Sequence, residues 1–118
     1  MRIRNLTRNT ELASSARTAQ SFWMRLVGLL GRSSLEPGEA LVLQPCNSIH
    51  TAFMRFAIDV VYLDRSGRVV KAVSSLKPFR MSGVLRGGDA VIELPSGVIV
   101  TTDTAVGDEL VFENARSS

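Results

Sequence analysis

The stretch Ile58-Asp59-Val60-Val61-Tyr62-Leu63-Asp64-Arg65-Ser66-Gly67 decides the fold class of this chain. Residues 58–63 carry apolar side chains on both faces of an extended segment, which is typical of an inner strand covered on each side. The next four residues form a turn in which Gly67 can adopt a positive φ. Residues 68–76 then predict the returning strand. The sequence therefore predicts a β-hairpin at this position.

Shorter apolar segments on both sides of the hairpin predict further strands. They are bounded by proline, glycine or polar turn residues, as short strands in antiparallel sheets commonly are. A turn at 106–109 leads into the last of them. The predicted strands are residues 2–6, which could lie at a sheet edge, 40–43, 90–94, 98–102 and 110–113.

One segment has the periodicity of an amphipathic helix. Starting at Ser15 or Thr18, apolar side chains recur with helical spacing up to Leu30, and Gly31 is placed to end the helix in a left-handed conformation. The connections between the predicted strands are too short for the crossovers of a parallel sheet. The sequence therefore predicts an α+β domain, mostly β, built as an antiparallel sheet or a small, partly closed barrel with one N-terminal helix.

The length and composition of the chain are those of one globular domain. The chain has 118 residues, of which 45% are hydrophobic and 21% charged. This permits a core without a disulfide or a metal, and no cofactor is expected. We expect residues 1–118 to form a single domain, with its core within about 17–113 and a frayed tail at 114–118.

The distribution of charge argues against nucleic-acid binding. The formal net charge is +3, but the basic residues are scattered, and five Phe, one Trp and one Tyr leave few side chains for base stacking. The longest apolar runs fall short of the roughly 20 residues of a membrane span. Residues 1–5 lack the apolar region of a signal peptide. We therefore expect a cytoplasmic protein whose partner is a small molecule or another protein.

The one cysteine and the one histidine of the chain both lie in the segment Cys46–Asp59. Phosphate-binding loops, nucleophile elbows and zinc-protease motifs are missing. Cys46, His50 and Asp59, joined by Glu93, could bind zinc, although this spacing is a weak signal. Alternatively, Cys46 could be a nucleophile that His50 activates. In the structural alternative, Cys46 is a small buried hydrophobe and His50 binds a carbonyl group.

The two acidic residues in apolar strands, Asp59 and Glu93, also have structural and functional interpretations. A carboxylate in such a strand is costly unless it is paired or hydrogen-bonded. For Asp59 the candidate partners are Arg55, Arg80 or a series of backbone N–H groups, and we favour a structural role. Glu93 could be an inward-facing acid or a charge at a sheet edge.

The leading functional hypothesis is a binding pocket that performs no chemistry. Its ligand would be an unidentified small molecule or protein, and no metal is assigned to it. The alternative is an enzyme, a hydrolase or transferase that uses His50 with a carboxylate, with or without a metal. The candidate ligand-binding residues are Cys46, His50, Thr51, Met54, Arg55, Asp59, Arg80 and Glu93.

Five stretches of the chain match motifs of a known family. They are Gly28 to Arg32, Cys46-x-x-Ile49-His50-Thr51-x-Phe53-Met54-Arg55-Phe56-x-Ile58 to Asp64, Leu76-Lys77-Pro78, Val91 to Gly97 and Gly107-Asp108-x-Leu110. Through these residues the chain resembles the "domain of unknown function 192" family of small bacterial and archaeal proteins. The resemblance implies a compact, mainly β fold with a helix, and it carries over no established activity. Family members often have proline at the position of Ala57, and they often have a short helix after Gly97, where residues 98–102 locally predict a strand.

Overall fold

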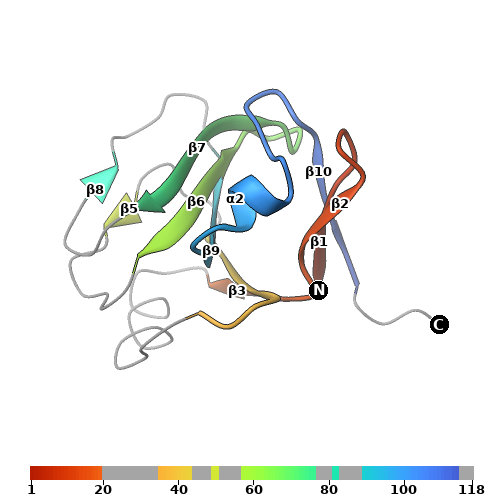
Figure 1. Cartoon of the computed structure of the whole chain (residues 1–118). Coiled ribbons are helices and arrows are strands. Elements are labelled where there is room, and N and C mark those ends of the chain that lie inside the picture. Colours follow the sequence, from red (N-terminus) through yellow and green to blue (C-terminus); the bar gives the residue numbers. More distant parts are fainter. Residues whose placement is uncertain (20–34, 44–48, 51–56, 77–80, 83–88, 115–118) are drawn as a thin grey trace.

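The computed structural model describes residues 1–19, 35–43, 49–50, 57–76, 81–82 and 89–114. Their largest element is a five-stranded sheet with the order β3-β4-β9-β6-β7 (Figure 1). All neighbouring strands in it are antiparallel except β3 and β4, which are parallel. The strands are β3 (Ser15–Ala19), β4 (Glu39–Leu43), β6 (Ile58–Leu63), β7 (Val69–Leu76) and β9 (Ala90–Pro95).

Two smaller groups of strands and one short helix complete the described structure. A three-stranded antiparallel sheet has the order β10-β1-β2, and β5 pairs with β8 in a two-stranded ladder. In Figure 1, β5 and β8 lie on the other side of β6 and β7 from the three-stranded sheet. The elements are β1 (Arg2–Asn5), β2 (Thr10–Ala13), β5 (Ile49–His50), β8 (Met81–Ser82), α2 (Val98–Thr101) and β10 (Leu110–Glu113).

The predicted hairpin is confirmed as β6 and β7. All six residues of β6 are buried, because the strand lies inside the sheet and both of its faces are covered. Gly67 adopts a φ of 87° in the turn. A Cβ at this position would lie 2.8 Å from the carbonyl oxygen of Leu110, so the turn needs glycine for space as well as for conformation.

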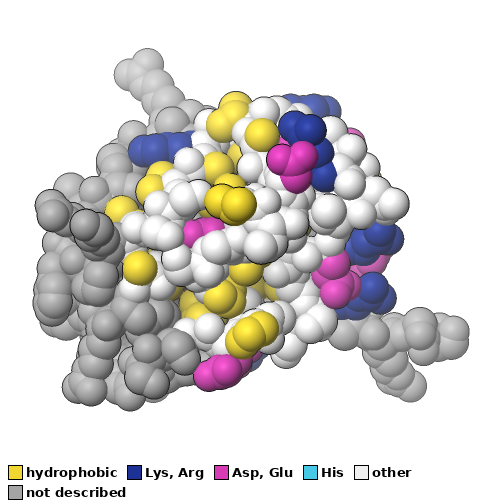
Figure 2. Space-filling view, in the orientation of Figure 1, with side chains coloured by type: hydrophobic (Ala, Val, Ile, Leu, Met, Phe, Trp, Pro, Cys, Tyr) yellow, Lys and Arg dark blue, Asp and Glu magenta, His cyan; other side chains and the backbone are white. Residues whose placement is uncertain are grey.

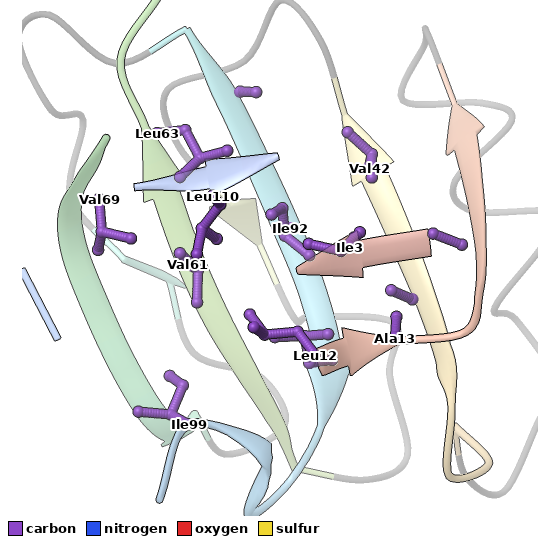
Figure 3. Close-up of a cluster of buried hydrophobic side chains, with 14 residues drawn as sticks. Ile3, Leu12, Ala13, Val42, Val61, Leu63, Val69, Ile92, Ile99 and Leu110 are labelled. Atoms are coloured by element: carbon purple, nitrogen blue, oxygen red, sulfur yellow. The ribbon is translucent and has the colours of Figure 1, made fainter. Parts of the chain in front are cut away.

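The main hydrophobic core lies between the two larger sheets. Ile3 of β1 and Leu110 of β10 point towards Val61 of β6 and Ile92 of β9, and Ile99 of α2 closes one end (Figure 3). A second apolar cluster covers the opposite face of the five-stranded sheet and includes Tyr62. The core thus includes residues before position 17, where we expected it to begin.

Strands 40–43, 90–94 and 110–113 are confirmed as β4, β9 and β10, but four other predictions from the sequence are wrong. Ser15–Ala19 is not the start of a helix, because it pairs in parallel with β4 along its whole length; the rest of the predicted helix lies outside the described residues. Strand β1 is the middle strand of its sheet and not an edge. The described strands also do not close into a barrel.

Residues 98–101 form helix α2 instead of the predicted strand. Gly97 precedes the helix with a φ of 103°, which turns the chain away from β9. The side chain of Asp59 then accepts hydrogen bonds from the backbone N–H groups of Gly97 and Ile99. These tertiary contacts override the local preference of the β-branched residues for an extended conformation. Among the described residues, no helix has the length and apolarity required to cross a membrane.

Candidate functional site

The two acidic residues that the sequence placed in apolar strands lie on opposite faces of the five-stranded sheet. Asp59 of β6 pairs with Leu94, whose side chain belongs to the core between the sheets. Glu93 of β9 pairs with Val60 on one side and with Leu41 on the other, and both of these belong to the second cluster. Since paired residues share a face, Asp59 and Glu93 do not converge on one site.

Asp59 is held by backbone groups. Its side chain is fully buried, and its Oδ1 accepts the N–H of Ser75 at 2.8 Å. Its Oδ2 accepts the N–H groups of Gly97 at 3.1 Å and Ile99 at 2.8 Å. Three such bonds compensate the cost of burying a carboxylate. The sequence analysis proposed Arg55, Arg80 or backbone N–H groups as partners of Asp59, and the structure shows the backbone N–H groups.

The Asp59 carboxylate also fixes a bulge in the neighbouring strand. Ile58 pairs with Leu76 and Val60 pairs with Val73, so β7 has one extra residue opposite Asp59. Ser75 lies in this bulge with a φ of 54°, a conformation that is uncommon outside glycine. The hydrogen bond from its N–H to Asp59 stabilises this conformation. Asp59 thus joins β6, the β7 bulge and the start of α2.

Glu93 occupies the centre of the other face. It lies on β9, the middle strand of the sheet, and its side chain is fully buried. Glu93 is therefore an inward-facing acid and not a charge at a sheet edge. We call this surface the Glu93 face and define it by Glu93 and the buried apolar cluster on the same side. The residues of that cluster are Leu35, Leu41, Leu43, Ile58, Val60, Tyr62 and Val91.

Tyr62 is a second polar group on the Glu93 face. It is fully buried and pairs with Val91, two residues from Glu93 on the same strand, so the phenol and the carboxylate are diagonal neighbours. The Nζ of Lys71 lies 5.5 Å from the centre of the Tyr62 ring, within the range of a cation–π interaction. No pattern in the sequence indicated this contact between Tyr62 and Lys71.

The β5–β8 ladder connects the Cys46–Asp59 segment to the segment that follows β7. His50 pairs with Met81, the residue directly after Arg80. In Figure 1 this ladder lies near the ends of β6 and β7, away from the three-stranded sheet. For His50 the structure describes the backbone and its pairing with Met81. Outside the described residues lie Cys46, Thr51, Met54, Arg55 and Arg80.

Within the described ranges, no three His, Cys, Asp or Glu side chains form a group that could hold a metal ion. The zinc hypothesis combined Asp59 and Glu93 with Cys46 and His50. Because Asp59 and Glu93 lie on opposite faces of the sheet, they cannot both be ligands of the same metal ion.

A buried polar network at the other end of the molecule was missed by the sequence analysis. Asp108 is 2% exposed, and its Oδ2 accepts hydrogen bonds from Asn5 Nδ2 at 2.9 Å, Ala105 N at 3.0 Å and Arg8 Nε at 3.1 Å. Asn5 also donates to Thr104 Oγ1 at 3.2 Å. The network ties β1 to the loop before β10. Gly107-Asp108 belongs to the stretch that carries the family resemblance, but locally it indicated only a turn.

These features define a small, mostly β domain with a structural acid on one sheet face and a buried acid on the other. The chain matches the family model of DUF192, described as "Uncharacterized ACR", over residues 4–112. It therefore belongs to this family.

Curated relatives of the chain come from archaea. A UPF0127 protein of Pyrococcus furiosus is 34% identical over 90% of this chain and 93% of its own length. A UPF0127 protein of Pyrococcus horikoshii is 34% identical over 92% and 96%, and one of Thermococcus sibiricus is 30% identical over 92% and 73%.

Two crystal structures share the fold. A protein of unknown function from Novosphingobium aromaticivorans has a TM-score of 0.76 at 14% identity and covers 94% of this chain and 82% of its own. A protein from Sinorhizobium meliloti, described as a candidate transcription regulator, has a TM-score of 0.74 at 18% identity, with coverages of 93% and 89%. At these identities the similarity concerns the fold alone.

Proposed function

We propose that this chain is a non-enzymatic binding domain whose ligand contacts the Glu93 face and the Cys46–Asp59 segment. The ligand is an unidentified small molecule or a segment of another protein. The main support is the position of Glu93, a fully buried carboxylate at the centre of a mostly apolar sheet face that also contains Tyr62. A few polar groups within a mostly apolar lining are characteristic of ligand sites.

The β5–β8 ladder supports the inclusion of His50 in this site. The pairing of His50 with Met81 attaches the histidine-containing strand to the chain that follows β7. In Figure 1 the ladder lies on the other side of β6 and β7 from the three-stranded sheet. A binding site formed between the ladder and the sheet would therefore use segments from both halves of the sequence.

The hydrogen bonds of Asp59 favour binding over catalysis. An enzyme that used His50 with a carboxylate would need an acid whose oxygens can exchange protons with a substrate. Asp59 is unsuited to this, because its two oxygens accept three backbone N–H groups and it faces the core. Glu93 is the acid that such an enzyme would have to use, in apolar surroundings. Turnover of a substrate panel that His50→Ala abolishes would replace our proposal with the enzyme alternative.

Nucleic acid is not the partner that we propose. Two of the described arginines bind acidic side chains: Arg2 Nε lies 2.8 Å from Glu11, and Arg8 contacts Asp108 at 3.1 Å and Asp103 at 3.8 Å. Figure 2 shows basic and acidic side chains next to one another on the side formed by β1, β2 and β10. Binding to DNA or RNA that weakens steeply with salt would contradict this part of the proposal.

Native mass spectrometry tests the proposed site. The wild-type chain, His50→Ala and Glu93→Gln are purified without chelator from a host extract, together with Glu11→Gln as a control that changes an exposed glutamate. We expect an additional bound mass on the wild type and the control, and its loss from the two site variants. Circular dichroism verifies that all four proteins are folded. A bare wild-type protein, or a bound mass that both site variants retain, would contradict the proposal.

A further inference from the structure

A pocket of about 290 Å³ lies where β6 turns into β7, next to β10. Its lining comes from the turn 64–67, from the start of β9 and from the first three residues of β10. The turn and β10 adjoin each other at the top of Figure 1. The pocket is separate from the Glu93 face, because its buried residues belong to the core between the two sheets.

The inner wall of the pocket is apolar. Leu63, Ala90 and Leu110 are 1%, 3% and 4% exposed and form part of the main core. Phe112, which is partly buried against the same core, contributes an aromatic side chain. This wall can therefore accept hydrocarbon, and a cation placed over the Phe112 ring would be attracted to it.

Backbone hydrogen bonds hold the walls together. The N–H of Leu110 donates to Gly67 O at 2.9 Å, which attaches β10 to the turn. The N–H of Asp89 donates to Leu63 O at 2.7 Å, which attaches the start of β9 to the end of β6. A ligand would thus meet a pocket that is already formed, and it would lose little affinity to the ordering of the protein.

The outer part of the pocket is acidic on a chain whose overall charge is positive. Asp64 and Asp89 line it together with one basic residue, Arg65, whereas the chain has a net charge of +3. The hydroxyl of Ser66 and the backbone N–H of Arg68 donate to Asp64 and lower the pKa of this carboxyl, so that Asp64 is ionised at neutral pH.

The geometry of Asp64 leaves room for a ligand. The Ser66 hydroxyl at 2.7 Å, the Ser66 N–H at 2.9 Å and the Arg68 N–H at 3.0 Å all bind Oδ1. Within the described part of the chain, no hydrogen bond of Asp64 ends on Oδ2. The turn therefore fixes the carboxylate through one oxygen and can present the other to a donor.

We infer that this pocket binds an organic cation, an ammonium or guanidinium group on a short hydrocarbon stem. The stem lies against Leu63, Leu110 and Phe112, and the cationic head binds Asp64 and Asp89. The volume corresponds to roughly ten water-sized groups, which matches such a ligand. The cation can come from a free amine or from a Lys or Arg side chain of another protein.

Titration of the full-length ¹⁵N-labelled chain, followed by NMR, tests this inference. The probes are agmatine, which has a guanidinium group on a four-carbon stem, and 1-pentanol as a neutral comparison. We expect saturable shifts at the amides of 64–67, 89–90 and 110–112, with an affinity on the order of millimolar for so small a ligand. Agmatine binds at least about tenfold more tightly than the alcohol because of the charge-assisted hydrogen bond.

Two matched variants test how much the negative charge of Asp64 contributes to binding. Asp64→Asn keeps an Oδ1 acceptor for the turn and removes the negative charge, and it should weaken agmatine binding about tenfold. Asp103→Asn removes a charge from an exposed aspartate outside the pocket and should leave the affinity unchanged. Equal binding of agmatine and 1-pentanol, equal weakening in both variants, or the lack of saturable shifts at the pocket would overturn the inference.

Blocked amino acids distinguish the source of the cation. If N-acetyl-arginine amide or N-acetyl-lysine amide binds as tightly as agmatine, the pocket accepts a side chain of a partner protein. If agmatine binds and both blocked amino acids do not, the ligand is a free amine. Both outcomes retain the cation site, whereas failure of all three cations rejects it.

Discussion

The buried carboxylates in this chain differ in what surrounds them, and this difference determines their roles. Asp59 accepts three backbone N–H groups and holds α2 and the β7 bulge in place. Asp108 accepts one backbone N–H and two side chains and joins β1 to the loop before β10. Glu93 lies on the centre strand, on the opposite sheet face from Asp59 and on the same face as Tyr62. We therefore assign structural roles to the two aspartates and propose a binding role for the glutamate.

At the residue scale, Asp108 should make stability depend on acid pH. Burial raises the pKa of Asp108, but hydrogen bonds from Asn5, the Ala105 N–H and Arg8 outweigh it, and the net change is downward. The unfolded chain, with an aspartate pKa of about 3.9, then binds the proton first as the pH falls. The stabilisation by Asp108 is thus fully present at neutral pH and is lost below about pH 4.

Urea denaturation of the wild type and Asp108→Asn measures this effect. The variant cannot titrate at this position, so the wild type should exceed it in free energy of unfolding by a constant amount from pH 7 to about pH 5. That difference should shrink as the pH falls through the pKa of the folded carboxyl. A difference that stays constant down to pH 2 would show that the ionised form of Asp108 is not what stabilises the fold.

At the scale of the elements, the β6–β7 turn depends on Gly67. Alanine there must adopt a φ near 87° and place its Cβ 2.8 Å from the Leu110 carbonyl oxygen. Gly107 is the matched control, with a φ of 97° and no atom within 4 Å of an added Cβ. We expect Gly107→Ala to cost about 1 kcal/mol from conformation alone, and Gly67→Ala to cost at least ~1 kcal/mol more. Thermal denaturation of the two variants measures the difference, and equal costs would refute the steric argument.

The same turn shows which elements could be predicted from the sequence. The hairpin was predictable because its strands and turn are adjacent in the chain. Ser15–Ala19 was misassigned, because its extended conformation depends on a parallel pairing with β4, about twenty residues away. Residues 98–101 were misassigned because a buried carboxylate on β6 binds the N–H groups at the start of the helix. The local periodicity of a segment gives no information about partners that are distant in the sequence.

The candidate site was predictable to a similar extent. The sequence identified Asp59 and Glu93 as acids in apolar strands, but it left open whether Glu93 faces inward or lies at a sheet edge. That the two acids face opposite sides depends on the register between β6 and β9, in which Val60 is paired with Glu93. Register is set by pairing and by the bulges, which no motif in the chain specifies.

At the scale of the whole molecule, the two larger sheets share one core. Ile3 and Leu12 of the three-stranded sheet pack with Val61 and Ile92 of the five-stranded sheet (Figure 3). Ile3 is fully buried, so truncation to alanine should lower the free energy of unfolding by about 2–5 kcal/mol. We expect both sheets to be destabilised by the same free energy, because neither sheet can bury its inner face without the other.

Native-state hydrogen exchange tests whether the chain unfolds as a single unit. In Ile3→Ala, the protection of the β6 amides should fall by the same free energy as that of the β1 amides. Leu6→Ala serves as the control, because Leu6 is 50% exposed and its truncation should change either value by less than about 0.5 kcal/mol. If β1 lost its protection while β6 kept it, the three-stranded sheet would open independently. The Glu93 face would then be expected to keep its ligand in that partly opened state, since none of its defining residues lies on β1, β2 or β10.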